Sequence, residues 1–235
     1  MKALVLRHEP DGPSGEIGVR LTERGIDLDD HLITPDIGQP RQTTGPLPAY
    51  SDFDMLVVMG SVRSLTQKDE IDTWIYAELE LLRSAHSSNV PILGICFGGQ
   101  LLAEMSGGLV EPAPSAEIGW YEISPIEGTD CPVGAGPWMQ WHHDRFVAPP
   151  EAEVMAKSAA GQQLFRLGRS VGTQFHPEIT EDVLDGWLVA CDTDYVAEHN
   201  VDVDQLRLDT RLNQAASAVA CHRLVDWFLD SVAFK

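Results

Sequence analysis

The chain has 235 residues, 43% of them apolar and 22% charged, and its 36 acidic against 16 basic residues give a formal net charge of −20. This composition is typical of a globular protein and excludes a disordered one. The length is sufficient for one large α/β domain with its own core. The negative charge repels nucleic-acid phosphates and anionic membranes, so we expect neither as a partner.

The sequence also indicates a cytoplasmic chain. Its apolar stretches fall short of the ~20 residues that a membrane span needs, and the apolar run before Arg7 is too short for a signal-peptide core. The four cysteines, Cys96, Cys131, Cys191 and Cys221, form no CxxC pair, which predicts reduced thiols and no zinc site. We expect no metal and no cofactor.

Apolar patterns predict strands and helices that alternate along the chain. Strands are expected over 2–9, 52–61, 90–96 and 169–178, and helices over 15–25, 69–88 and 215–232. Turn residues multiply between about 110 and 170, which indicates a strand-rich section there, and 34–52 is a proline-rich connection within the domain. We therefore predict a single α/β domain over residues 1–235, with an open, mostly parallel or mixed sheet and helices on both faces.

The stretch Gly94-Ile95-Cys96-Phe97-Gly98 places a thiol where a buried strand turns into an amphipathic helix. A nucleophile framed by glycines is typical of an elbow on a sharp strand-to-helix turn, because a side chain at either flank would collide with a neighbouring strand or helix. The helix N-terminus favours a thiolate. We therefore expect Cys96 to be exposed at the C-terminal edge of the sheet as a nucleophile, and the other cysteines to be packing residues.

The segment QFHPE, residues 174–178, supplies a base and a carboxylate. Alternate residues of a strand point to the same face, so His176 and Glu178 would stand side by side, and Pro177 indicates an edge or an end of the strand. Alone, such a pair more often lies on a solvated surface. Beside a thiol nucleophile, a histidine and an orienting carboxylate complete a catalytic triad.

These two segments together resemble the class I, or triad, glutamine amidotransferases, and in particular their stand-alone, GMP-synthase-like members. The stretches 57–64, 116–120 and 141–146 agree with that resemblance. It implies that Cys96 attacks the side-chain amide of glutamine or another γ-glutamyl compound and forms a glutamyl thioester. It further implies that His176, oriented by Glu178, protonates the leaving amine and then activates water.

The resemblance also implies where the oxyanion and the substrate would bind. Backbone N–H groups of Phe97 and of the loop at Gly60 and Ser61 would hold the oxyanion. Gln100 and Gly98 would lie at the substrate, although Gln100 could equally be a helix residue that faces solvent.

Two positions depart from the family pattern. The oxyanion loop has Ser61 where a second glycine is usual, and the position before Gln100 is Gly99, where histidine is frequent. A serine at the first position needs a backbone angle that glycine adopts more easily. Both departures put the identity of the substrate in question more than the chemistry.

Several alternatives stay open at this point. The chain could be a hydrolase with its own γ-glutamyl substrate, a glutaminase subunit that delivers ammonia to a synthase on a separate partner chain, or a non-catalytic binding module on the same fold. An α/β-hydrolase would place the acid before the histidine, whereas the candidate acid here follows it. A dinucleotide-binding fold lacks its GxGxxG after the first strand.

Two clusters between residues 120 and 146 have less specific interpretations. His142-His143-Asp144 has no second cluster at metal-ligand spacing and is interpreted as a loop near the active site. Four aromatic residues lie between 120 and 141; core packing is the default interpretation, and a pocket for the leaving amine is the alternative.

Overall fold

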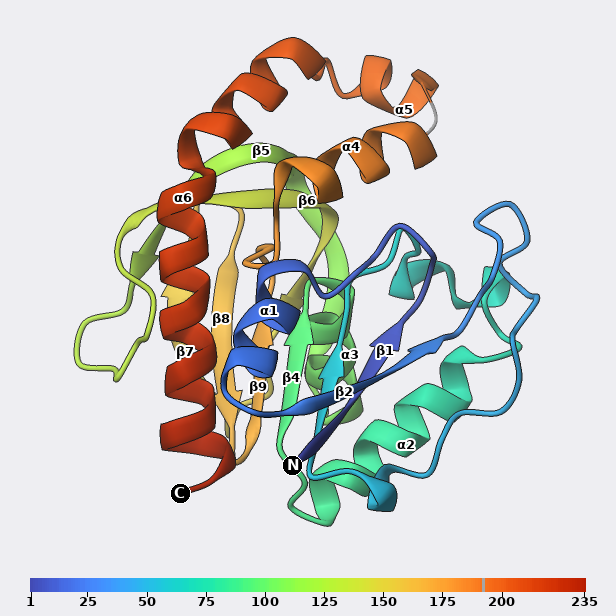
Figure 1. The fold of residues 1–235 in the computed structure, drawn as a ribbon. Coiled ribbons are helices and arrows are strands. Elements are labelled where there is room, and N and C mark those ends of the chain that lie inside the picture. The colour runs from blue at the N-terminus through green and yellow to red at the C-terminus, as the bar shows by residue number, and fades with distance from the viewer. Residues whose placement is uncertain (192) are drawn as a thin grey trace.

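A computed structural model describes residues 1–191 and 193–235, without the side chains of 193 and 194. Nine strands of these residues form one sheet in the order β2-β1-β3-β4-β9-β8-β7-β5-β6 (Figure 1). The strands are β1 Lys2–Arg7, β2 Asp27–Leu32, β3 Met55–Val58, β4 Ile92–Ile95, β5 Leu109–Pro125, β6 Gly136–Val147, β7 Glu153–Lys157, β8 Gln162–Leu167 and β9 Ser170–Thr173. The helices are α1 Gly15–Glu23, α2 Ile75–Ser87, α3 Phe97–Met105, α4 Glu181–Ala190, α5 Thr193–Glu198 and α6 Val203–Trp227, with 3₁₀ segments at Tyr50–Asp52 and Leu65–Glu70 and a π-helical segment at Phe228–Ala233.

The sheet has a parallel half and an antiparallel half. Strands β2, β1, β3, β4 and β9 pair in parallel, and the remaining pairs are antiparallel. The predicted mixed sheet and strand-rich section near 110–170 are therefore confirmed. Because β4 and β9 are parallel neighbours, the segments that follow them meet at one edge of the sheet, where open α/β sheets place their sites.

Helices cover both faces of the parallel half, as predicted (Figure 1). On one face α1 and α6 pack over the sheet, with Ile17 of α1 and Leu224 of α6 in one apolar cluster with Val57 of β3. On the other face α2 and α3 bury a second cluster that includes Val58. Strands β1, β3 and β4 are thus covered on both sides, which explains why their sequences are continuously apolar.

Some element boundaries differ from those expected. Strand β9 ends at Thr173, so the predicted strand over 169–178 is too long. Strand β2 was not expected, because its sequence DLDDHL is polar and it lies half exposed at the edge of the sheet. Helix α6 begins at Val203, well before the predicted start at 215, since its first half is too polar to show an apolar stripe.

No helix among the described residues is long and apolar enough to cross a bilayer. The assignment of residues 1–235 to a single domain stays a prediction.

Candidate active site

Cys96 lies on a strained turn between β4 and α3. Its φ is 51° and its ψ is −105°, a conformation that non-glycine residues rarely adopt. A Cβ on Gly94 would lie 2.5 Å from the carbonyl oxygen of Gly98, and one on Gly98 would lie 2.1 Å from that of Val58 in β3. Both flanking glycines are therefore required sterically, as the elbow motif predicts.

His176 and Glu178 lie in the segment that follows β9, directly beside the elbow on β4. His176 Nδ1 is 2.7 Å from Glu178 Oε1, and both side chains are buried. The backbone N–H of His176 donates to the carbonyl of Met139 in β6, which fixes this segment. The pair is side by side as predicted, but strand alternation is the wrong reason for it, because the strand has already ended at Thr173.

The other ring nitrogen of His176 is available for chemistry. Among the described residues Nε2 has no hydrogen-bond partner. Burial lowers the pKa of His176, but the adjacent Glu178 and Cys96 outweigh burial and raise it to about 10. The ring is therefore an imidazolium at neutral pH, and its charge stabilises negative charge on the neighbouring sulfur.

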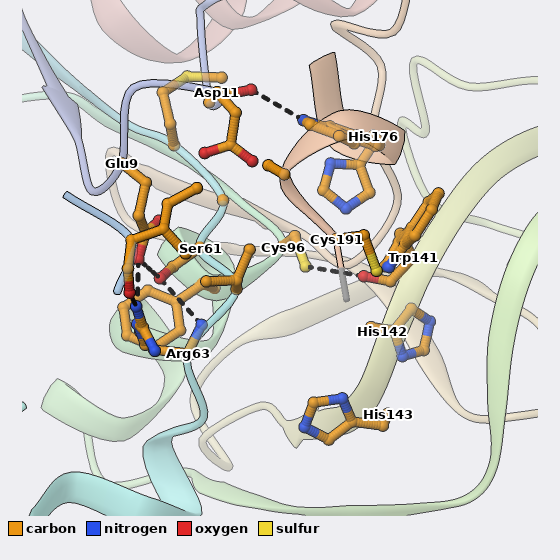
Figure 2. A pocket seen from close by; sticks show the side chains of 18 of the residues that line it. Glu9, Asp11, Ser61, Arg63, Cys96, Trp141, His142, His143, His176 and Cys191 are labelled. Atoms are coloured by element: carbon orange, nitrogen blue, oxygen red, sulfur yellow. Dashed lines mark hydrogen bonds and ion pairs between the residues drawn. The ribbon is translucent and has the colours of Figure 1, made fainter. Parts of the chain in front are cut away.

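These residues line a cavity of about 180 Å³. Figure 2 shows Cys96 between two walls, one with Glu9, Ser61 and Arg63 and the other with Trp141 and two histidines of β6. Cys96 is only 4% exposed. The thiol therefore lies inside a cavity, and our expectation of an exposed thiol at the sheet edge was wrong.

A helix that sequence analysis missed covers the cavity. Trp187 of α4 lines it and packs edge-on against His176, with ring centroids 4.7 Å apart. The indole N–H of Trp187 donates to the carbonyl of Asp11, which ties α4 to the loop after β1.

The loop after β3 approaches the thiol as the oxyanion-loop interpretation requires. A Cβ on Gly60 would lie 3.2 Å from Cε1 of His176 and 3.8 Å from Cβ of Cys96. The φ of Ser61 is not positive, so serine fits this position without the conformational freedom of glycine, and its hydroxyl donates to Glu9 Oε1 at 2.8 Å. In the part of the chain that the structure describes, the Ser61 N–H has no acceptor. Phe97 begins α3, so its N–H has no partner within the helix.

The two predicted substrate contacts have different surroundings. Gln100 is 3% exposed and lines the cavity, with Nε2 3.3 Å from the carbonyl of Asp144, so the solvent-facing alternative is wrong. Gly98 does not line this cavity; its packing against β3 accounts for the glycine. At Gly99 a Cβ would lie 2.3 Å from the carbonyl oxygen of Thr173, which explains why no histidine stands there.

His142, His143 and Asp144 belong to strand β6, so their interpretation as a loop was wrong. All three line the cavity. His142 is buried, with Nε2 3.1 Å from Glu117 and Nδ1 2.9 Å from the carbonyl of Asp144, whereas the His143 side chain is 46% exposed. Within the described ranges no group of three or more His, Cys, Asp or Glu side chains is arranged to hold a metal ion.

The four aromatic residues between 120 and 141 have three kinds of surroundings. Trp141 lines the cavity, and its carbonyl oxygen lies 4.0 Å from the Cys96 sulfur. Trp138 packs on Phe175 in the core, and Trp120 donates to Thr210 of α6. Core packing therefore explains Trp120 and Trp138, the Tyr121 side chain is exposed, and only Trp141 fits the pocket alternative.

Sequence analysis missed further residues around the thiol. The Gln174 side-chain amide is 3.6 Å from the Cys96 sulfur, although this residue belongs to the QFHPE segment. His8 and Glu9 are fully buried directly after β1. They lack a local pattern such as the glycine frame that identified Cys96, so sequence analysis gave them no role.

The family model described as glutamine amidotransferase class-I matches residues 36–189. The chain belongs to this family. The chain is 32% identical over 154 residues to the glutamine amidotransferase-like protein YfeJ of Salmonella typhimurium. This match covers 59% of this chain and 62% of that protein. It is also 32% identical over 141 residues to a subunit of the glutamine-hydrolyzing GMP synthase of Ignicoccus hospitalis, covering 57% of this chain and 71% of that subunit.

Other relatives are much longer than this class-I amidotransferase. The glutamine-hydrolyzing GMP synthase of Aeropyrum pernix is 38% identical over 112 residues, and the match covers 42% of this chain but only 21% of that protein. Among solved structures, a glutamine amidotransferase of Thermotoga maritima has a TM-score of 0.84 at 22% identity and 98% coverage of both chains. One of Methylobacillus flagellatus has a TM-score of 0.82 at 23% identity, covering 98% of this chain and 95% of that one. The predicted family and fold class are confirmed.

Proposed function

We propose that this chain hydrolyses the γ-glutamyl amide bond of glutamine or of a small γ-glutamyl amide, with Cys96 as the nucleophile. The observation that carries this proposal is the strained thiol at the elbow, beside a buried histidine whose Nδ1 is held 2.7 Å from Glu178. A thiol, a proton carrier and an orienting carboxylate are the groups that amide hydrolysis through a covalent intermediate needs.

The reaction proceeds through two displacements at the amide carbon. The Cys96 sulfur attacks that carbon, and the tetrahedral intermediate collapses with cleavage of the C–N bond while His176 gives its Nε2 proton to the departing nitrogen. Ammonia or an amine leaves, and a glutamyl thioester stays on Cys96. His176 then takes a proton from water, the resulting hydroxide attacks the thioester carbonyl, and the C–S bond breaks to release glutamate.

Negative charge on the tetrahedral oxygen is stabilised by backbone donors. The N–H groups of Phe97 and Ser61 are candidates, because neither has an acceptor among the described residues and both residues line the cavity beside Cys96. Removal of one such donor commonly lowers kcat by about 10²–10³-fold.

The cavity favours a substrate of amino-acid size. Its volume of about 180 Å³ is small compared with the roughly 300–1,000 Å³ of sites for drug-sized ligands. Trp141, Trp187 and Tyr195 form its aromatic side and would contact the leaving amine. This supports glutamine or a compact γ-glutamyl amide over a long peptide.

A second candidate function is that of a glutaminase subunit that delivers ammonia to a synthase on another chain. The similarity to the Ignicoccus hospitalis protein favours it, since that relative is named as one subunit of a glutamine-hydrolyzing synthase. Under this alternative the same thioester chemistry would run, and turnover would depend on the partner.

The deciding measurement is glutamate release by the purified chain alone from glutamine and from γ-glutamyl amides of increasing bulk. We expect turnover in the native chain and in Cys131→Ala, loss of turnover in Cys96→Ala, and preferential alkylation of Cys96 in peptide maps. Turnover that begins only when a synthase chain is added would replace the hydrolase by the subunit function. Tight binding of a γ-glutamyl compound with neither turnover nor an acyl adduct on Cys96 would support the binding-module alternative.

A further inference from the structure

The first strand leads into a buried ion pair that the proposed reaction does not use. His8 follows β1, and Glu78 lies in the first turn of α2; both side chains are 0% exposed. His8 Nε2 lies 3.1 and 3.2 Å from the two carboxylate oxygens of Glu78, and His8 Nδ1 lies 3.0 Å from the carbonyl oxygen of Gly60. This buried pair therefore contacts the oxyanion loop through the carbonyl oxygen of Gly60.

The partners of His8 favour its protonated form. A backbone carbonyl oxygen only accepts hydrogen bonds, so Nδ1 donates to Gly60, and a second proton on Nε2 would place an imidazolium against both side-chain oxygens of Glu78. Burial lowers the pKa of His8, but the charge and hydrogen bond of Glu78 outweigh burial and raise it. Trp74 and Phe97 pack on the ring, with centroids 5.5 and 4.8 Å away, and hold its orientation.

The contact with Gly60 orients the peptide unit that links it to Ser61. In a trans peptide the C=O and the following N–H point in opposite directions, and the described residues contain no cis peptide. Because the Gly60 carbonyl points at His8, the Ser61 N–H points the other way. A Cβ built on Gly60 would contact His176 and Cys96, and Gly60 and Ser61 both line the cavity, so the two sides of this peptide face the buried ion pair and the cavity.

A second contact fixes the Gly60–Ser61 peptide through the side chain of Ser61. Glu9, adjacent to His8, accepts a hydrogen bond from the Ser61 hydroxyl at 2.8 Å, and that hydroxyl accepts one from the Arg63 N–H at 3.1 Å. Two consecutive residues directly after β1 thus hold both residues of the loop (Figure 2 shows the Glu9 side).

We propose that His8, charged and held by Glu78, is a positioning residue that turns the Gly60–Ser61 peptide so that the Ser61 N–H donates to the oxyanion formed at Cys96. This rests on the proposed function. The ring charge also polarises the peptide, which makes the Ser61 N–H a stronger donor. The contact serves the transition state and not substrate binding, so its loss lowers kcat while KM stays nearly unchanged.

Two neutral variants separate the two contacts of the ring. In His8→Asn the side-chain NH₂ occupies the place of Nδ1 and still donates to Gly60, whereas in His8→Gln it occupies the place of Nε2 and reaches only Glu78. We expect His8→Gln to lose kcat by roughly 10²-fold, the scale of a missing oxyanion donor, and His8→Asn to keep most of it. Equal kcat values in the two variants, with melting curves showing both folded, would overturn the proposal.

A structural measurement tests the positioning role without turnover. In the native chain, ¹⁵N NMR of the His8 ring should show both nitrogens protonated at neutral pH. Crystal structures should show the Gly60 carbonyl turned as in the native chain in His8→Asn and turned away in His8→Gln. An unchanged carbonyl in His8→Gln would refute the positioning role even if no substrate is found. A turned carbonyl in a chain that hydrolyses nothing would keep the positioning role and remove the proposed function.

Discussion

Single residues determine the chemistry through the direction in which a few polar atoms point. His176 Nδ1 is held by Glu178, so Nε2 alone is available to the thiol and the substrate. His142, in contrast, has both ring nitrogens engaged, by Glu117 and by the carbonyl of Asp144. Of the two buried histidines of the cavity, only His176 therefore has a ring nitrogen that can carry a proton between other groups.

This difference predicts the order of effects among histidine variants. His176→Ala should remove nearly all turnover, Glu178→Gln should have an intermediate effect because the carboxylate only orients and charges the ring, and the exposed His143→Ala should keep most activity. Single-turnover rates with saturating substrate measure this. His142 is a poor control, because its replacement removes the ion-pair partner of buried Glu117 and leaves that carboxylate only its hydrogen bonds from Ser158 and Gln163. Full activity in His176→Ala would contradict the assignment.

Gly60 offers a test that does not alter a reacting group. A methyl group at this position would lie 3.2 Å from Cε1 of His176, tighter than ordinary contact, and would displace the ring or the loop. We expect Gly60→Ala to lower kcat by about 10-fold or more, since misplacement by ~1 Å can cost ~10²-fold. Gly186→Ala in α4 is the matched control, because nothing lies within 4 Å of its Cβ. Equal rates would place the loop away from the reaction.

Sequence alone could identify the residues that carry a strong local pattern and not those that act through backbone geometry. Cys96 is framed by glycines and His176 is followed by proline and a carboxylate, and both patterns are readable without coordinates. His8 is different, since its significance depends on the direction of the Gly60 carbonyl and on Glu78, which arrives from another helix. No local pattern relates these three positions.

At the scale of elements, hydrophobic periodicity predicted the strands and helices that bury apolar faces. It failed where burial is partial, as in the polar edge strand β2 and the first half of α6. It also overlooked α4, which covers the cavity. Hydrophobic periodicity also cannot predict the charged contact between α1 and α6, where Arg20 and Arg24 donate hydrogen bonds to Asp226.

This cluster predicts a pH-dependent contribution to stability. Hydrogen bonds from Arg20, and then Arg24, hold the pKa of Asp226 below its usual value. The stabilisation is therefore present above the unfolded value of about 4 and is lost as the pH falls through the lower folded value. We expect Asp226→Asn to reduce the free energy of unfolding by up to about 1 kcal/mol at pH 7, since the groups are partly exposed.

Urea unfolding at pH 7 and near pH 3.5 measures this difference. The loss caused by Asp226→Asn should shrink at the lower pH. Glu80→Gln, which breaks an exposed pair with Arg83 within one helix, should cost less at pH 7. A loss from Asp226→Asn that is equally large at both pH values would mean that packing, and not charge, holds α1 to α6.

At the scale of the whole molecule, the net charge of −20 acts on every state of the chain. Repulsion among like charges destabilises the compact state more than the unfolded one. Salt screens this repulsion, with a Debye length of about 10 Å at 0.1 M. We expect the free energy of unfolding at pH 7 to rise from low salt to about 0.3 M, with sodium and potassium chloride acting alike. A fall would mean that local ion pairs such as Arg24–Asp226 outweigh the overall repulsion.

The backbone strain at Cys96 has a consequence for how such a chain changes over generations. A non-glycine residue at φ 51° costs on the order of 1–3 kcal/mol, and a glycine there would relieve most of it. A lineage that no longer used the thiol would therefore gain stability by replacing it, so the strain is tolerable only while the proposed role of Cys96 is needed. Cys96→Gly should fold more stably than Cys96→Ser, although neither would turn over substrate.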